Sequence, residues 1–581
     1  MGHVVSLHRY PIKGFQGKTL DRVTLTCGAG VPGDRVAGIS RGPVARNAAP
    51  FYQLTTHESL VHFRSGNHAG ALTLHARASG DSGDLLSDPA RLREAFGAQA
   101  GVVQREDGLG HWDFDDSILS IINVNTVKAL ADKMGVPVDP MRFRGNLYIE
   151  AEPFSEFDWL GRGVQFGETC LSIIRPIKRC RATSVNPQSG EVDMNTPAQL
   201  NRHFGHLYCG VYAQVERGGT LTPGDCVKLT SERFPGKLAI ATTVPKAPAV
   251  VSWPRPARVV DVIEEATGIR SIWLEDSLAA LGSLDDIKAG QHIALHGLTD
   301  TGLWRRYTVS GREGDRLRIT VKRETGEGSR AIHGFKVGQS VRLSGPFGPD
   351  TLDLDSPAIL ILSAGIGITP TTTKLKALAD ARYHKPVRIV HSVRFGHELA
   401  LWGEVGAIAQ RLGDVSTVLH VTQDQDAVEN AVAGRPDIAA LITEAARMNA
   451  AIHVCGSEGF QAQVLAIATQ AGVADRLHMD SFATPDTAVD MRPIPDSGPF
   501  TVTFKRSGIV ATWQPKDGPL LHFAESKGLV VPAHCRAGLC QTCECAVVEG
   551  GVYSLSEASR TRKGHALLCA AVPVGDVVLD C

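Results

Sequence analysis

The chain has 581 residues, which is too long for one hydrophobic core and predicts about four domains. Its 60 basic and 61 acidic residues almost cancel, so the composition argues against a nucleic-acid surface and against bulk attraction to membranes. No apolar run reaches membrane-spanning length, and the first residues lack a signal-peptide pattern. Twelve cysteines, mostly scattered singly, suit a reducing compartment, and we therefore expect a cytoplasmic protein.

The first third of the chain carries a series of short motifs. They are, in order, Tyr10-Pro11-Ile12-Lys13, Arg142-Phe143-Arg144-Gly145-Asn146, Phe157-Asp158-Trp159, the basic stretch from Arg175 to Pro187, and Gly224-Asp225. This order resembles the MOSC proteins with an N-terminal β-barrel, a group that includes the mitochondrial amidoxime-reducing component. The resemblance spans about residues 1–232 and implies an N-terminal β-barrel over 1–115, followed by a MOSC domain over 116–233.

In that family, the cysteine that matches Cys180 binds molybdenum through its sulfur. The resemblance further implies that Lys13, Arg144 and Asn146 help to bind the pterin of the molybdenum cofactor. A thiolate is a soft metal ligand, and we expect the adjacent cations, Arg179 among them, to lower the pKa of Cys180 and to attract the molybdopterin phosphate. The alternative is a solvated basic turn that contains an incidental cysteine.

Three departures from the amidoxime reducers bear on this site. Ile177-Lys178 stands where those proteins have Cys-Ser, Asn186 stands where they have Asp, and residues 42–50 give no clear match to their Thr-Ala-Arg-Gln sequence. These differences leave the pterin contacts of that stretch and the substrate open. Cys209 either lines the same pocket or belongs to the core.

The middle of the chain begins after a proline-rich stretch. Residues 234–255 contain repeated prolines, which favour an extended linker over a regular element. Short strands with alternating polarity follow, such as 258–264 and 316–322. They predict a small antiparallel barrel over residues 256–352.

Two motifs within this predicted barrel resemble the flavin site of the ferredoxin reductases. They are Arg305-Arg306-Tyr307-Thr308 and the basic, glycine-rich stretch from Val321 to Ser329. The resemblance implies that Tyr307 stacks on the isoalloxazine ring and that Thr308 faces its N5 edge. Arg305 and Ser329, with Gly328 beside them, would hold phosphate, because a guanidinium fork suits phosphate oxygens. FAD is the favoured flavin, and FMN is the alternative.

From about residue 358 the pattern changes to wholly apolar strands that alternate with helical stretches. This pattern predicts a doubly wound parallel sheet over residues 353–484. After its first strand comes a loop in which backbone amides and a helix start can hold pyrophosphate; its marker residues are Gly365, Gly367, Thr369 and Pro370.

A second loop of this sheet contains Cys455-Gly456 after a later strand, as in the nicotinamide domain of the same reductases. The resemblance places Cys455 beside the nicotinamide ring, and the alternative is a small apolar residue at a strand end. The family usually has Pro where this chain has Ser457, which would loosen the turn. Arg394, near the end of the second strand, could meet a 2′-phosphate, yet such arginines also occur in NADH users. We expect NADH or NADPH, with NADH favoured.

A second proline-rich linker, 485–498, precedes the last segment, 499–581. Four cysteines there have the C-x4-C-x2-C…C spacing of a plant-type [2Fe-2S] cluster: Cys535, Cys540, Cys543 and Cys569. Gly538 lets the ligand loop bend, and we expect the fourth ligand to return from a later strand. The alternatives are zinc or a disulfide pair, although zinc sites more often have two C-x2-C hooks or a histidine. Cys545 is expected to be a buried thiol.

The order of flavin barrel, nicotinamide domain and plant-type ferredoxin resembles phthalate dioxygenase reductase over about residues 256–581. We therefore expect a multidomain α+β and α/β protein that ends in a β-grasp ferredoxin. Our hypothesis is a self-sufficient reductase that passes electrons from NAD(P)H through flavin and [2Fe-2S] to molybdenum and reduces N-hydroxylated compounds, or N- or S-oxides. The alternative is a reductase that feeds a separate oxygenase or other partner, with the MOSC region as a docking or sulfur-carrier domain.

Overall fold

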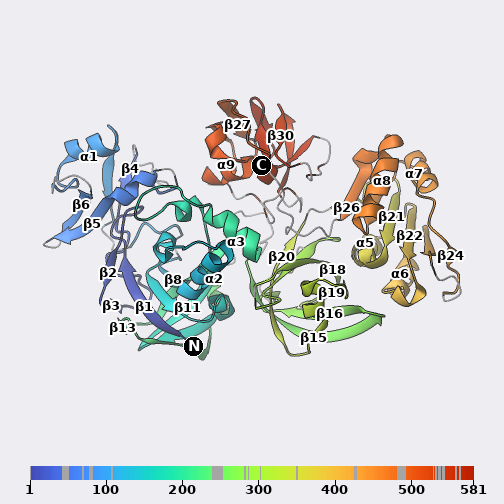
Figure 1. The fold of residues 1–581 in the computed structure, drawn as a ribbon, viewed down its shortest axis with the longest axis horizontal. Coiled ribbons are helices and arrows are strands. Elements are labelled where there is room, and N and C mark those ends of the chain that lie inside the picture. The colour runs from blue at the N-terminus through green and yellow to red at the C-terminus, as the bar shows by residue number, and fades with distance from the viewer. Residues whose placement is uncertain are drawn as a thin grey trace. The chain divides into compact units, whose positions relative to one another are not determined.

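The computed structural model describes residues 2–581 except for a set of short segments. These are residues 42–50, 56, 69–70, 78–82, 106–108, 115, 239–252, 280–282, 285–286, 301, 349–350, 424–427, 481–491, 528, 530, 532, 534–537, 539–542, 557–558, 560 and 562–563. The chain forms two compact units, Met1–Ala247 and Pro248–Cys581 (Figure 1). Among the described residues, none of the helices has the length and apolar character needed to cross a membrane.

An eight-stranded sheet forms the core of the first unit. Its strands, in spatial order, are β14 (Cys226–Arg233), β10 (Arg162–Phe166), β11 (Thr169–Lys178), β12 (Tyr208–Arg217), β8 (Leu119–Asn123), β9 (Leu147–Glu150), β1 (Gly2–Arg9) and β2 (Lys18–Leu20). A further pairing of β1 with β14 closes the strands into a ring. Since β1 pairs with both β9 and β14, the ring joins residues 1–115 to residues 116–233, which the sequence divides into two domains.

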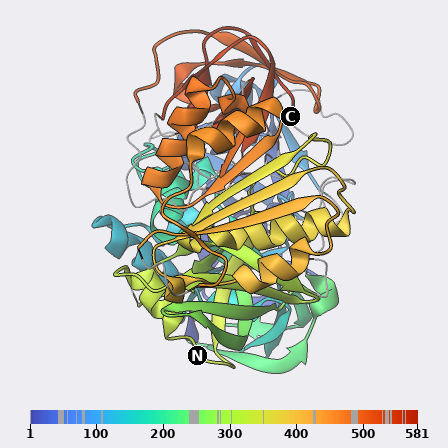
Figure 2. The same cartoon turned by 90° about the vertical axis from the view of Figure 1, so that its right-hand side faces the viewer.

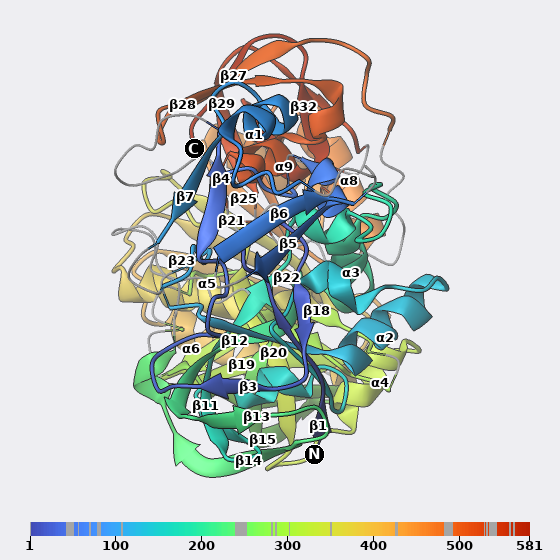
Figure 3. The ribbon, with the colours of Figure 1, turned by 90° about the vertical axis from the view of Figure 1, so that its left-hand side faces the viewer.

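Smaller elements pack around this sheet and carry the remaining motifs of the first unit. The paired strands are β3 (Val23–Leu25) with β13 (Gly219–Leu221), β4 (Ala37–Ser40) with β7 (Gly101–Gln104), and β5 (Phe63–His68) with β6 (Ala71–Ala76). The helices are α1 (Pro89–Phe96), α2 (Val124–Met134) and α3 (Thr196–Phe204), and β4 to β7 with α1 are labelled among the blue elements of Figure 3. Each helix begins at an Asp or Asn whose side chain accepts from the backbone of the first turn.

The second unit begins with a closed barrel of six antiparallel strands, which confirms the predicted barrel. In spatial order they are β15 (Arg255–Ala266), β16 (Ile269–Asp276), β19 (Arg316–Lys322), β18 (Arg305–Glu313), β17 (His292–His296) and β20 (Ser340–Phe347). One short helix, α4 (Glu327–His333), follows β19. Alternate side chains such as Ile272, Leu274, Leu317 and Ile319 fill the interior, as the period-two pattern predicts.

The parallel sheet of the second unit is also as predicted. Its order is β24 (Val432–Ala433), β23 (Val415–Val421), β22 (Val387–Val393), β21 (Ile359–Ala364), β25 (Ala451–Cys455) and β26 (Leu477–Asp480). The helices are α5 (Thr369–Asp380), α6 (Trp402–Ala409), α7 (Ile438–Arg447) and α8 (Glu458–Gln470). Ile359 and Ile361 of β21 pack with α5 and α6, whereas Leu360 and Leu362 pack with α7 and α8, so both faces are covered (Figure 2).

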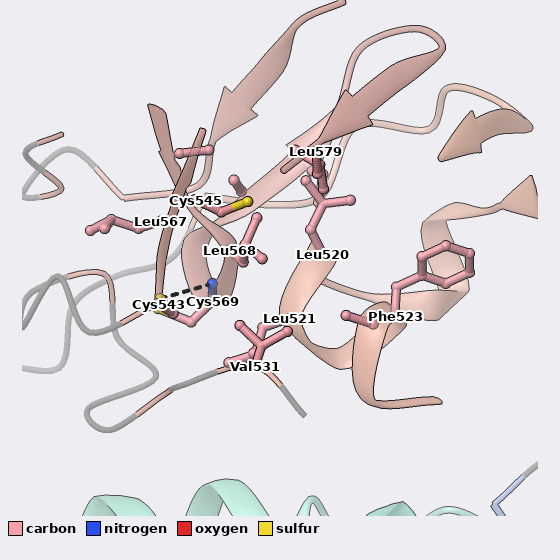
Figure 4. Close-up of a cluster of buried hydrophobic side chains, with 14 of the residues drawn as sticks. Leu520, Leu521, Phe523, Val531, Cys543, Cys545, Leu567, Leu568, Cys569 and Leu579 are labelled. Carbon is pink, nitrogen blue, oxygen red and sulfur yellow. Dashed lines mark hydrogen bonds between the residues drawn. The ribbon is translucent and has the colours of Figure 1, made fainter. Parts of the chain in front are cut away.

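The chain ends in a five-stranded sheet with one helix. The sheet order is β28 (Ile509–Trp513), β27 (Phe500–Phe504), β33 (Val577–Leu579), β29 (Glu544–Glu549) and β31 (His565–Leu567), and β30 (Val552–Ser554) pairs with β32 (Ala571–Pro573). The pairing of β27 with β33 is parallel, whereas its neighbours are antiparallel. Helix α9 (Leu520–Ser526) buries Leu520, Leu521 and Phe523 against this sheet (Figure 4).

A fully buried ion pair ties the first strand of the flavin-type barrel to the second. The Arg255 guanidinium donates to both Asp276 oxygens, at 2.6 Å from Nη2 to Oδ2, and neither side chain is exposed to solvent. Asp276 also accepts from the Leu278 backbone and the Ser283 hydroxyl. We expect Asp276→Asn to lower the free energy of unfolding of this region by about 3 kcal/mol, because it leaves the buried Arg255 charge without its counter-charge. Denaturant unfolding followed by tryptophan fluorescence measures the loss.

A matched control is available on the same pair of strands. Glu275 pairs with Arg258 at 2.8 Å, but both side chains are exposed. Glu275→Gln should therefore cost less than about 1 kcal/mol. Equal losses for the two variants would show that burial does not set the strength of the Arg255 pair.

Candidate functional site

The structure describes two of the four cysteines in the motif of the last domain. Cys543 precedes β29, and Cys569 lies in the 3-10 turn η11 (Leu568–Ala570); both side chains are buried (Figure 4). The expectation that the fourth ligand comes from a strand is therefore wrong, because the chain turns between β31 and β32 to present Cys569. Cys535 and Cys540 lie outside the described residues. Cys545 is buried, as predicted.

Backbone N–H groups point at both described sulfurs of this motif. The N–H of Cys569 donates to Sγ of Cys543 at 3.4 Å, and the N–H of Gly538 donates to Sγ of Cys569 at 3.2 Å. A Cβ on Gly538 would lie 2.3 Å from Oγ of Ser559, and its φ is +72°, so only glycine fits. Thiolates that accept backbone hydrogen bonds are the donor set of a [2Fe-2S] cluster, and these residues fit that group.

The two predicted flavin motifs meet in the barrel. Arg305 and Tyr307 lie on β18, and α4 brings Gly328 against both side chains. A Cβ on Gly328 would lie 2.9 Å from Cγ of Arg305 and 3.3 Å from Oη of Tyr307. Burial raises the pKa of Tyr307 and keeps its phenol neutral, and Thr308 beside it is buried. A tyrosine ring, a guanidinium and a close backbone approach in one place fit a flavin nucleotide.

The Ser329 hydroxyl is engaged within its own turn. It donates to the carbonyl groups of Glu324 and Gly326 and accepts from the N–H of Glu324 at 3.0 Å. These bonds shape the turn that precedes and opens α4. A direct bond from this hydroxyl to phosphate stays a prediction, and it would replace a local bond.

The two nucleotide motifs of the parallel sheet meet at the carboxyl ends of neighbouring strands. Ser363 at the end of β21 pairs with Cys455 at the end of β25. A Cβ on Gly367 would lie 2.3 Å from the carbonyl oxygen of Cys455 and 2.8 Å from the backbone N of Gly456. Gly367 therefore lets the two loops touch, at the edge where open parallel sheets bind nucleotides.

The residues around this contact build the first turn of the following helix. Gly365 has a positive φ of +55° and begins the 3-10 turn η7 (Gly365–Ile368). Thr369 is buried, its hydroxyl donates to the carbonyl of Ile366 at 3.1 Å, and Pro370 lies in the first turn of α5. Proline suits this position because its missing N–H has no partner there.

Cys455 is a buried neutral thiol. Burial raises its pKa well above the usual value, and the nearby Asp480 carboxylate raises it further. Asp480 is opposite Cys455 in the β25–β26 register and accepts from the buried Lys374 ammonium at 2.6 Å. Sequence reasoning missed Lys374, although its place on α5, one turn after the glycine loop, is a signal that could have found it.

Contacts between the barrel and the parallel sheet hold these two sites together. The hydroxyl of Thr372 on α5 donates to the carbonyl of Ser310 on β18 at 2.7 Å. Two ion pairs also join them, Arg318 with Glu404 at 2.7 Å and Lys322 with Glu398 at 2.8 Å. The strand that carries Arg305 and Tyr307 is thus bonded to the helix that follows the nucleotide loop.

Ser457 and Arg394, which the sequence singles out in the nucleotide domain, both have visible contacts in the structure. Ser457 is the N-cap of α8, where its hydroxyl accepts from the N–H of Phe460. Arg394 follows β22 with 62 % of its side chain exposed, and its Nη2 lies 3.6 Å from Oε1 of Glu398. An exposed cation beside a carboxylate is compatible with either nicotinamide nucleotide, so the preference for NADH stays a prediction.

In the first unit, Cys180 follows β11 as an exposed residue at the start of the 3-10 turn η4 (Arg181–Ser184). Desolvation by the surrounding residues raises the pKa of its thiol, and the backbone hydrogen bond from Ala182 and the charge of Arg179 offset this only in part. Arg179 thus lowers this pKa, as expected, but desolvation and the Asp113 carboxylate outweigh it, so the pKa of the thiol is raised overall. Arg181 pairs with Glu58 at 2.5 Å instead of facing the sulfur.

The residues predicted to contact the pterin differ in how strongly their side chains are bonded to other parts of the protein. Lys13 is mostly buried, and its Nζ donates to Oδ1 of Asp113 at 2.8 Å. Arg144 has φ +52°, donates to the carbonyl of Phe15 at 2.7 Å and lies over the Tyr10 ring. Lys13 lowers the pKa of Asp113, and the Asp113 carboxylate raises the pKa of Cys180, which brings together three groups that the sequence did not connect.

Asn146 and Arg179 are bonded to the protein itself. The amide oxygen of Asn146 accepts from Ser120, and its Nδ2 donates to the carbonyl of His8. The buried Arg179 guanidinium donates to the carbonyl groups of Cys209 and Phe143, at 2.7 Å from Nε to Cys209. These side chains brace the strands behind Cys180, and pterin contacts through them remain a prediction.

The first unit contains a small cavity of about 20 Å³, and Gly14, Gln16, Arg142, Arg144 and Ala182 are among the residues that line it. Cys209 belongs to the hydrophobic core, and burial raises the pKa of its thiol to about 12. That position favours the core over the pocket for Cys209. Residues 42–50, where the pterin motif gives no clear match, lie outside the described residues. An exposed thiol with a lysine close by is compatible with a molybdenum cofactor.

Four family profiles match the chain, in the order that the sequence predicts. They are the MOSC domain at residues 105–228, the oxidoreductase FAD-binding domain at 271–350, the oxidoreductase NAD-binding domain at 361–465, and the 2Fe-2S iron-sulfur cluster binding domain at 502–574. The matches confirm the resemblance to a MOSC protein combined with a reductase module. They also show that the flavin domain is of the FAD-binding type.

Individual proteins are similar to about half of this chain. An NADPH oxidoreductase of Mycobacterium tuberculosis is 31 % identical over 307 residues, which cover 51 % of this chain and 77 % of that protein. The reductase subunit of glycine betaine monooxygenase from Pseudomonas aeruginosa is 27 % identical, covering 56 % of this chain and 94 % of that protein. Among solved structures, phthalate dioxygenase reductase is 22 % identical with a TM-score of 0.35, covering 56 % of this chain and 98 % of that one.

Because Gly328 lies so close to Arg305, we expect a side chain at position 328 to weaken flavin binding. Gly328→Ala places a methyl group 2.9 Å from Cγ of Arg305, so the side chain that would hold phosphate must move. We expect FAD affinity to fall about tenfold, equivalent to about 1.4 kcal/mol. Titration of the flavin-free protein with FAD measures it. Gly326→Ala is the control, because nothing lies within 4 Å of a Cβ there; similar losses in both variants would contradict the steric explanation.

Proposed function

We propose that this chain is a self-sufficient molybdenum-cofactor enzyme that reduces N-hydroxylated compounds, or N- or S-oxides. The chain belongs to the NAD(P)H oxidoreductases with FAD-, NAD- and [2Fe-2S]-binding domains. The observation that carries this proposal is the exposed Cys180 thiol in the MOSC unit of a chain that also contains a complete reductase module. A separate reductase would then be unnecessary.

The residues of the second unit have roles that follow from their positions. The loops at Gly367 and Cys455 hold the pyridine nucleotide, and the contact of Thr372 with Ser310 keeps that site against the barrel. Arg305 holds phosphate, and Tyr307 packs on the ring of the bound flavin. Flavin, when bound, accepts two electrons from a nicotinamide and releases them singly, which a [2Fe-2S] cluster requires.

In the first unit, Cys180 supplies the metal ligand of the proposed site. Its thiol must lose a proton when a metal binds, and the raised pKa of the free thiol makes that loss depend on the metal itself. Lys13, mostly buried beside Asp113, supplies a positive charge for the anionic cofactor. Arg144 and Ala182 both line the small cavity of this unit. The substrate class comes from the resemblance to the amidoxime reducers.

A second function is supported by the names of the relatives. Two of them are the reductase subunit of glycine betaine monooxygenase and the vanillate O-demethylase oxidoreductase of a Pseudomonas strain, the latter 29 % identical over 290 residues. By analogy, this chain would feed a separate oxygenase or other partner. The MOSC unit would then dock that partner or carry sulfur on Cys180, without molybdenum.

Metal content separates the two functions. Protein purified from a host that makes the molybdenum cofactor should contain molybdenum, and Cys180→Ala should lower the content at least about tenfold, because the only thiolate ligand of the proposed site is lost. Elemental analysis by mass spectrometry measures it. Cys226→Ala, which removes another exposed thiol of the same unit, should leave the content unchanged. Wild-type protein without molybdenum would favour the second function.

Removal of a cluster ligand tests the electron route. We expect Cys543→Ser to leave the bleaching of flavin by NAD(P)H intact, because the nucleotide and flavin sites lie in other domains. Turnover of an N-hydroxylated substrate should fall at least about a hundredfold, because the cluster no longer has its full set of thiolates. Stopped-flow absorbance and product analysis measure the two steps, with Cys27→Ser as the control. Unchanged turnover would show that electrons bypass the cluster.

A further inference from the structure

Two cysteines of the ferredoxin domain, Cys545 and Cys581, belong to none of the cofactor sites described above. Strands β29 and β33 pair antiparallel, and beyond β33 the N–H of Asp580 donates to the carbonyl of Ala546 at 3.0 Å. The same antiparallel register places Cys581 directly opposite Cys545. Both thiols are free in the structure.

The type of this cross-strand position decides how close the two thiols are. Ala546 and Asp580 form a hydrogen-bonded pair, so the next residues, Cys545 and Cys581, form a non-hydrogen-bonded pair. In such pairs the Cα atoms are about 4.5 Å apart and the side chains lie on the same face. Disulfides need Cα atoms about 4.4–6.8 Å apart. The side chains are also close enough to hydrogen-bond to each other.

We propose that Cys545 and Cys581 form a reversible disulfide when a small-molecule disulfide, such as oxidised glutathione, is present. The thiolate of Cys581 attacks the small disulfide, forms a mixed disulfide and releases one small thiol. The sulfur of Cys545 then attacks the mixed disulfide, loses its proton to the departing small thiol and closes the protein disulfide. The two protein thiols lose two electrons and two protons in total, and the small disulfide gains them as two thiols.

Position and charge explain why Cys581 reacts first. Cys545 is buried within the sheet, whereas Cys581 is partly exposed. The hydrogen bond with Cys545 and the charge of Arg506 lower the pKa of the Cys581 thiol. The thiolate is the nucleophile in exchange with a disulfide, so an accessible thiol with a lowered pKa attacks before its buried partner.

The disulfide would act on the cage that holds the cluster. Cys543 immediately precedes β29, and Cys569 lies within the loop that a bond between residues 545 and 581 would close. A cross-link over this loop restricts the opened forms of the domain in which Cys543 and Cys569 separate. Oxidation of the pair therefore slows the loss of the cluster under the conditions in which free thiols are oxidised.

The test uses the full-length protein with its cluster, treated with oxidised glutathione. After alkylation of the remaining thiols and proteolysis, mass spectrometry should find a peptide pair linked through Cys545 and Cys581, and dithiothreitol should remove the link. Iron release to a chelator should become at least about threefold slower in the linked protein. Neither measurement needs molybdenum or turnover, so the result is independent of the proposed function.

Two variants complete the experiment. Cys581→Ser should abolish both the link and the slower iron release, whereas Cys226→Ser, at an exposed cysteine of the first unit, should retain both. If Cys581→Ser does not fold, the peptide map of the wild-type protein decides alone. Stable glutathione adducts on the two cysteines without a link would overturn the disulfide site. A link that leaves iron release unchanged would overturn its effect on the cluster.

Discussion

Three of the sites in this chain depend on a glycine whose backbone lies too close to a neighbouring segment for any side chain to fit. At Gly328, Gly367 and Gly538, an added Cβ would lie between 2.3 and 2.9 Å from another atom. Each of these glycines joins two motifs that are distant in sequence: α4 to β18 at the flavin site, the nucleotide loop to Cys455, and the ligand loop to the turn that carries Cys569. The position of the backbone therefore determines these sites for large planar or charged groups, because the backbone must come close enough to bind them.

Side chains outside the motifs then hold the close approaches in place. Lys374 and Asp480 form a buried ion pair beside Cys455, and the pairs Arg318 with Glu404 and Lys322 with Glu398 join the parallel sheet to the barrel. Buried and partly buried ion pairs require specific geometry, since a displaced partner leaves a desolvated charge. The nucleotide loop and the strand that carries Tyr307 therefore keep one arrangement.

The first unit differs in how its motif side chains are used. Several of its conspicuous basic and polar side chains are bonded to the protein, because a buried guanidinium or amide must find acceptors. Arg179 donates to carbonyl groups of Cys209 and Phe143, and Asn146 bridges Ser120 and His8. Asp113 interacts electrostatically with both Lys13 and Cys180, two motif residues of the proposed molybdenum site. Under the proposed function, the chemistry of this unit would depend on the exposed Cys180 thiol and a small number of charges near it.

The amino-acid sequence by itself determined the kinds of domain, their order and the spacing of the cysteine ligands, because strand periodicity, glycine loops and ligand spacing are local properties of the chain. It also picked out residues that the structure brings together: Gly328 lies against Arg305 and Tyr307, and Gly367 lies against Cys455. Only the tertiary structure decided that β1 closes the sheet of the MOSC unit, that Arg179 turns away from Cys180, and that Cys581 lies opposite Cys545. Strand partners and hydrogen-bond acceptors are set by contacts between distant residues, which no local pattern contains.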